Sequence, residues 1–134
     1  MDPAQALTEL KQISVQVQNA VVFDGSGGVE ASTLDEAAGA AMAAAAARLL
    51  EQAAQTVERG EEIVQIEAVL PEGSVVVVRD GGRAVAATTV PDPTVGLIFY
   101  DLRTCLRSLA EAEEQPKPKP RRKAPARKKA EDAA

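Results

Sequence analysis

One stretch decides the fold: DEAAGAAMAAAAARLLEQAAQTVER, residues 35–59. Eleven of its twenty-five residues are Ala. Because the Ala side chain is a single methyl group, another backbone can approach such a helix closely on several sides. The stretch therefore predicts one long helix whose surface is suited to contacts beyond its own sheet.

Polar residues mark both ends of this predicted helix. Thr33 and Glu36 have the spacing of a capping box, in which two side chains satisfy the first free backbone N–H groups. Gly60 has the position of a C-terminal stop. Between these ends, the apolar stripe that we expect to face the core consists of Met42, Ala46, Leu49, Leu50, Ala53 and Val57.

Short periodic segments on either side of the long helix predict the rest of the fold. Runs rich in β-branched residues favour strands, and apolar residues at a spacing of 3.6 favour helices. By these criteria the chain predicts a helix over residues 3–14, strands over 17–23, 29–32, 62–70, 74–79 and 84–90, and a helix starting at Pro93. Four consecutive Val residues in the fourth strand indicate that it is covered on both faces. The element order α-β-β-α-β-β-β-α is that of a mixed α/β (α+β) domain.

The first and last helices each have an expected core face. The first helix would bury Leu7, Leu10 and Ile13. The last helix would be capped by Asp92, with Pro93 at its first position, where the missing N–H does no harm. Its expected apolar stripe consists of Val95, Ile98, Phe99, Leu102, Cys105, Leu106 and Leu109.

The composition excludes several kinds of chemistry. The chain has no His, which excludes Ser/His and Cys/His catalysis and His-based metal sites. Its single Cys cannot form an internal disulfide, which suits a reducing compartment. The start has no secretory-signal pattern, and the Ala run is too weakly hydrophobic to span a bilayer. We therefore expect a cytoplasmic protein with no catalytic residue, no metal site and no cofactor.

Three features have both a functional and a structural interpretation. The Gly-rich segment 25–28 lacks the pattern of a phosphate loop, so a hairpin turn is favoured. Cys105 lies on an apolar stripe, which favours a buried thiol over a reactive one. Arginines can stabilise charge on a transferring phosphoryl group. Nothing in the sequence singles out one of them for this role, so solvated surface positions are favoured for Arg79, Arg83, Arg103 and Arg107.

The charge is divided unevenly along the chain. Residues 115–134 carry a net charge of +6, whereas residues 1–114 carry −11. We expect a folded domain over 1–114 and a disordered tail over 115–134, because the tail has too few apolar residues to form a core. The tail could bind DNA, RNA, anionic lipid or an acidic protein without sequence specificity, or it could serve only solubility. Its candidate contacts are Lys117, Lys119, Arg121, Arg122, Lys123, Arg127, Lys128 and Lys129.

Three segments, taken in order, support a resemblance to a known family. They are AVVFDGSGGVEAS (20–32), the Ala-rich helix followed by EIVQIE (62–67) and VVVV (75–78), and DPTVGLIFYDL (92–102). Together they resemble the Roadblock (dynein-light-chain-type) family, which includes bacterial regulators of small Ras-like GTPases. The likeness covers about residues 4–111.

The resemblance implies a fold, an assembly and a partner. The fold would be a five-stranded antiparallel sheet with the long helix on one face and two helices on the other. Two copies would form a homodimer by pairing their third strands and packing their long helices together, and an unprotected edge strand is a physical template for such pairing. The implied interface candidates are Ala38, Ala41, Ala45, Ile63, Gln65 and Glu67.

The function that follows is a non-enzymatic regulator or scaffold of a Ras-like small GTPase. The alternative is a nucleic-acid-associated protein whose body only dimerises and whose basic tail binds phosphates. A ligand-binding sensory domain is less favoured, because no polar cluster within the apolar framework would orient a small molecule.

Overall fold

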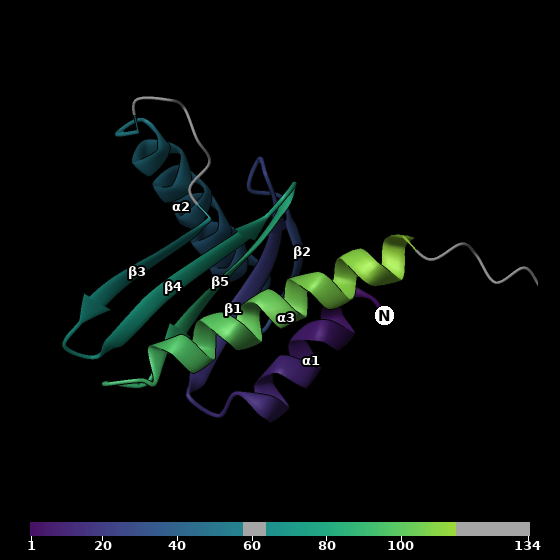
Figure 1. Ribbon diagram of the computed structural model, residues 1–134, viewed down its shortest axis with the longest axis horizontal. Coiled ribbons are helices and arrows are strands. Elements are labelled where there is room, and N and C mark those ends of the chain that lie inside the picture. Colours follow the sequence, from purple (N-terminus) through teal and green to yellow (C-terminus); the bar gives the residue numbers. More distant parts are fainter. Residues whose placement is uncertain (58–63, 115–134) are drawn as a thin grey trace, which may run out of the picture.

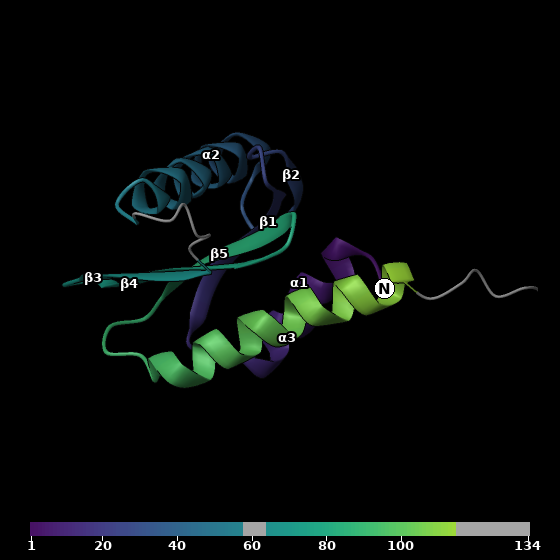
Figure 2. The same cartoon turned by 45° about the horizontal axis from the view of Figure 1, so that its top comes forward.

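The computed structural model describes residues 1–57 and 64–114 of the chain, and it shows two layers of helices around one sheet. The five strands are antiparallel, in the order β2-β1-β5-β4-β3. Helix α2 covers one face and helices α1 and α3 cover the other (Figures 1 and 2). The elements are α1 (Pro3–Ile13), β1 (Val17–Asp24), β2 (Val29–Ser32), α2 (Glu36–Ala54), β3 (Gln65–Leu70), β4 (Gly73–Asp80), β5 (Arg83–Thr89) and α3 (Val95–Glu114). The predicted order and layers are confirmed.

The sheet separates two hydrophobic cores. Val76 and Val78 of β4 pack with α1 and α3, whereas Val77 packs with α2 on the opposite face. This arrangement confirms that the Val-rich strand is covered on both faces. All seven residues of the expected α3 stripe contribute to the first core.

The turn between β1 and β2 is organised by Asp24. Its Oδ1 accepts hydrogen bonds from the backbone N–H groups of Ser26 and Gly28, at 2.9 and 3.0 Å, and from the Ser26 hydroxyl at 2.7 Å. These donors, the Ser26 hydroxyl foremost, lower the pKa of the Asp24 carboxyl. The hairpin interpretation of this Gly-rich segment is confirmed.

The predicted start of α2 is wrong by two residues. The N-cap is Asp35, whose Oδ1 accepts from the Ala38 N–H at 2.8 Å. Thr33 instead contacts β1, where its hydroxyl accepts from the Ala20 N–H at 2.9 Å and donates to the Asn19 side chain at 3.0 Å. The Thr33 hydroxyl thus bonds to β1 and does not form the predicted capping box.

The predicted end of α2 is also too late. The helix ends at Ala54, and the N–H groups of the next three residues donate to carbonyls three positions back, at 3.1 to 3.2 Å. Such bonds tighten the last turn and close a helix. Val57 therefore lies beyond the helix, and Gly60 lies outside the described residues.

The buried face of α2 differs from the expected stripe. Gly39, Ala43, Ala46 and Leu50 are the buried residues, whereas Leu49 is 38% exposed. Consecutive residues of a helix point about 100° apart, so the adjacent leucines cannot both face the sheet.

Three further predictions, one in each flanking helix and one in β3, differ from the structure. In α1, Ile13 is 69% exposed because Ser14, four residues after Leu10, continues the buried face. In α3, the Thr94 carbonyl accepts the first helical N–H bonds, so Asp92 is not the cap. Asp92 has a φ of +53° and lies before the helix. Strand β3 begins at Gln65, so Val64 is not part of it, and the predicted strand residues 62 and 63 lie outside the described residues.

Candidate functional site

Strand β3 forms one edge of the sheet and presents its outer backbone groups. Among the described residues, its only neighbouring strand is β4, and the pairing between them has no register shift. The Arg79 N–H donates to the Val64 carbonyl at 2.8 Å. In an antiparallel ladder alternate residues bond to the same neighbour, so Ile66 and Ala68 also direct their backbone groups at β4. The N–H and C=O groups of Gln65, Glu67 and Val69 therefore point outward and can template a further strand.

Apolar side chains accompany this open edge. Val64, Val69 and Leu70 are 57, 74 and 53% exposed. These three side chains are spread along the strand, with Val69 on the opposite face from Val64 and Leu70. Sequence reasoning missed Val69, although strand alternation groups it with the candidates Gln65 and Glu67.

The two faces of β3 differ in chemistry. On the α3 face, the Arg103 guanidinium donates to the Gln65 side-chain oxygen at 2.8 Å. Glu67 accepts from the Ser74 hydroxyl there at 3.5 Å. On the α2 face, Ile66 packs against the second core. The candidate Ile63 lies outside the described residues.

The outward face of α2 carries a row of small side chains. Ala41 and Ala45 are exposed and Ala38 is partly buried. Leu49 continues the row at the same four-residue spacing, so it belongs with the candidates rather than with the core. The tail candidates, residues 117–129, lie outside the described residues.

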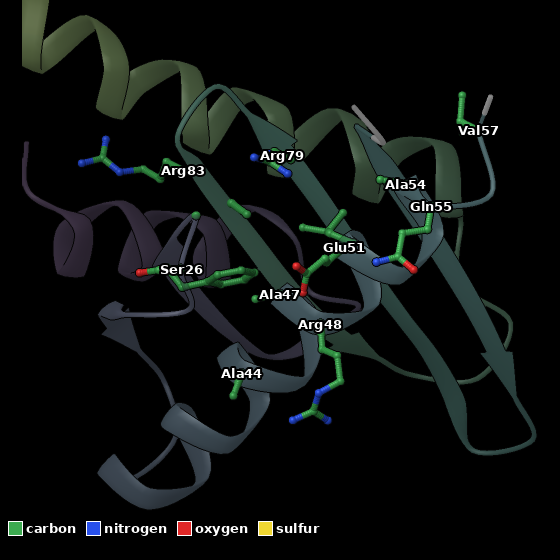
Figure 3. A pocket seen from close by; sticks show the side chains of 14 residues that line it. Ser26, Ala44, Ala47, Arg48, Glu51, Ala54, Gln55, Val57, Arg79 and Arg83 are labelled. Atoms are coloured by element: carbon green, nitrogen blue, oxygen red, sulfur yellow. The ribbon is translucent and has the colours of Figure 1, made fainter. Parts of the chain in front are cut away.

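A groove of about 880 Å³ lies between the C-terminal half of α2 and the sheet (Figure 3). Apolar side chains such as Phe23 and Leu50 form part of its lining. Arginines also line it, but Figure 3 shows the guanidinium groups of Arg48 and Arg83 pointing in different directions. These two guanidinium groups therefore do not converge on one point, as the polar groups of a small-molecule site do.

Arg83 has a structural role. Its guanidinium contacts Glu30 of β2 at 2.7 Å and Glu113 near the end of α3 at 2.5 Å. These carboxylates, Glu113 foremost, raise the pKa of Arg83. The ion pairs fasten the C-terminal end of α3 to the sheet, next to the point where the tail begins.

The chemistry of the described residues is sparse. Burial raises the pKa of the Cys105 thiol to about 11, so it is protonated at neutral pH and confirmed as a buried side chain. No group of three or more His, Cys, Asp or Glu side chains within 1–57 and 64–114 could hold a metal ion. In the same ranges, no helix has the length and apolar character needed to cross a membrane.

Comparison with known proteins gives similarity in structure rather than in sequence. No protein-family model matches the chain, and no curated protein matches it. A Roadblock/LC7 domain from Streptomyces avermitilis superimposes with a TM-score of 0.76 at 19% identity, covering 86% of this chain and 100% of that one. The gliding protein MglB from Thermus thermophilus gives a TM-score of 0.69 at 17% identity, covering 83% and 88%. Profilin IA from Acanthamoeba castellanii gives a lower TM-score, 0.54, at 13% identity, covering 78% and 97%. The chain therefore has a Roadblock/LC7-like fold.

Proposed function

We propose that this chain is a non-enzymatic, homodimeric regulator or scaffold of a Ras-like small GTPase in the cytoplasm. The observation that supports this most is the open β3 edge on a Roadblock/LC7-like fold. The GTPase partner follows from the resemblance of the sequence to the Roadblock family.

In the proposed dimer, two β3 edges pair and join two five-stranded sheets into one. A two-fold axis is the simplest closure for such contact, because each copy offers the same surface to the other. The exposed rows of α2, with Ala41, Ala45 and Leu49, then allow the two helix backbones to approach closely. The result is a broad rigid surface that neither copy has alone.

Regulation would occur by recognition at this surface. Within residues 1–57 and 64–114, no group of three or more His, Cys, Asp or Glu side chains could hold a metal ion. A ligand or partner shifts a two-state equilibrium only by binding one state more tightly than the other. The dimer would therefore act by preferring one nucleotide-dependent conformation of the GTPase.

The direct test mixes the purified full-length chain with candidate small GTPases loaded with GDP or with a non-hydrolysable GTP analogue. The proposal expects co-elution that depends on the nucleotide, or a changed rate of GTP hydrolysis. A dimer that binds none of the candidates in either state contradicts the proposal.

The basic tail motivates the second candidate, binding to the phosphate backbone of nucleic acid. Eight basic groups in residues 115–134 would give a salt dependence with a log–log slope of about −0.9 per phosphate contact on duplex DNA. Deleting residues 115–134 separates the two functions. The deletion abolishes DNA retention if the tail carries the function, and it leaves GTPase contact intact if the dimer surface does.

A further inference from the structure

We infer that two copies of this chain pair with the two-fold axis through Ile66, so that Gln65 of each copy lies opposite Glu67 of the other. This inference rests on the proposed homodimer and adds its register and its specificity-determining side chains. It follows from which backbone groups of β3 face outward and from what the side chains already contact.

Strand geometry leaves few possible axes. Directly opposed residues in an antiparallel pair have side chains on the same face of the sheet. When the two strands are identical and related by a two-fold axis, opposed residues therefore differ by an even number of positions in the sequence. The axis then passes through a residue rather than between two residues. Axes through Ile66, Glu67 or Ala68 each keep at least five of the seven residues from Val64 to Leu70 paired.

The axes through Glu67 and Ala68 both create unfavourable pairs. An axis through Glu67 gives the longest ladder, but it sets the two Glu67 carboxylates directly opposite each other, and like charges in this position are destabilising. An axis through Ala68 sets Glu67 opposite Val69, which offers the carboxylate no donor. It also sets the outward backbone groups of Gln65 opposite Pro71, which has no N–H.

The axis through Ile66 creates favourable pairs. Gln65 and the partner's Glu67 both direct their backbone groups outward, so they form a hydrogen-bonded pair. Their side chains share the α3 face, where the Gln65 oxygen already accepts from Arg103 at 2.8 Å. The Gln65 amide nitrogen can then donate to the carboxylate of the partner's Glu67. Arg103, behind Gln65, adds a positive charge beside that carboxylate.

Because of the two-fold symmetry, the pair of Gln65 and the partner's Glu67 occurs twice in the interface. On the other face, Ile66 meets its own copy, and Val64 meets the partner's Ala68, so the α2 side of the junction is apolar throughout. The pattern is self-complementary: polar with polar on one face, apolar with apolar on the other.

Disulfide trapping distinguishes the three axes without altering Gln65 or Glu67. Residues 64, 66, 68 and 70 would be non-hydrogen-bonded across the interface, with Cα atoms about 4.5 Å apart, within the range that a disulfide bridges. Ile66→Cys reports an axis through Ile66, and Ala68→Cys reports an axis through Ala68. The double variant Val64→Cys/Leu70→Cys reports an axis through Glu67. The unsubstituted full-length chain, with only the buried Cys105, is the control.

An axis through Ile66 predicts a reducible cross-linked dimer for Ile66→Cys under mild oxidation, and little cross-linking for the other variants. Predominant cross-linking of Ala68→Cys or of the double variant overturns the register while leaving the dimer in place. Absence of cross-links in every variant, together with a monomeric unsubstituted chain, overturns the homodimer itself.

Glu67→Gln gives a second readout of the register. If Glu67 faces Gln65, losing both carboxylates raises the dimer dissociation constant by about two- to thirtyfold. If Glu67 faces its own copy, the same substitution removes a repulsion and lowers the dissociation constant. Sedimentation equilibrium measures the direction, and a lowered constant contradicts the axis through Ile66.

Discussion

Gly39 of α2 lies against Ser32 of β2 so closely that a Cβ on Gly39 would be 2.6 Å from the Ser32 hydroxyl oxygen and 2.9 Å from its Cβ. Gly39 is buried in the middle of this contact. The absence of a side chain at Gly39 therefore sets the distance between α2 and the sheet, and with it the position of the exposed α2 row.

Gly39→Ala is expected to destabilise the protein, although Ala favours a helix by about 1 kcal/mol over Gly. Overpacking against Ser32 should outweigh that gain and cost about 1–3 kcal/mol of unfolding free energy. Urea denaturation measures the change. The matched control is Gly96→Ala in α3, where a Cβ would meet nothing within 4 Å. The control should be neutral or stabilising, and equal effects of the two substitutions would show that the close contact is absent.

The Cys105 thiol predicts a loss of stability at alkaline pH. Burial raises its pKa in the folded state to about 11, from an ordinary value of 9.0. The folded state holds this proton more tightly than the unfolded state does. The protonated thiol therefore makes its full contribution to the free energy of unfolding below about pH 9, and this contribution is lost as the pH rises towards 11. The loss should reach at most about 2 kcal/mol.

Urea denaturation between pH 7 and about pH 11 tests this expectation, with Cys105→Ala as the control. The variant should lose less stability over that interval than the native chain. Identical pH profiles would mean that the thiol titrates alike in the folded and unfolded states.

The ion pairs of Arg83 predict a salt-sensitive contribution to stability. Arg83→Met keeps an apolar stem but removes the contacts with Glu30 and Glu113, which should cost about 1 kcal/mol. The cost should shrink at high salt, because screening weakens partly exposed pairs. Arg48→Met, at an exposed position of α2, is the control. Denaturation at low and high salt measures the loss of unfolding free energy for Arg83→Met and for Arg48→Met. A loss for Arg83→Met no greater than that for Arg48→Met would show that the ion pairs of Arg83 do not stabilise the fold.

The outward direction of the Glu67 N–H predicts that Pro at this position blocks dimerisation without unfolding the chain. Proline is tolerated on an edge strand where the lost N–H faces solvent. Ile66→Pro is the control, because that N–H faces β4 and its loss should unfold the sheet. Circular dichroism and sedimentation should show a folded monomer for Glu67→Pro. A dimeric Glu67→Pro variant would mean that the copies associate elsewhere.

Apolar periodicity predicted the number, type and order of the elements, because each helix and strand must bury one side. The predicted helix ends failed where distant residues decide the outcome. The Thr33 hydroxyl is taken by β1, and the Thr94 N–H donates to the side chain of Gln16, 78 residues away. The spacing of residues near Thr33 or Thr94 in the sequence does not predict either hydrogen bond.

The candidate site was predicted in part. The resemblance pointed to Gln65 and Glu67, and the structure shows both exposed on an edge strand. Periodicity could not decide which of Leu49 and Leu50 faces the core, since a stripe accommodates either. The bond between Arg103 and Gln65 joins residues 38 apart and depends on how α3 crosses the sheet.

Sedimentation equilibrium of the full-length chain at micromolar concentration tests the central claim, self-association through β3, most directly. The account predicts a species of twice the 14.0 kDa chain mass that Glu67→Pro converts to single chains. A native chain that sediments only at 14.0 kDa would contradict it.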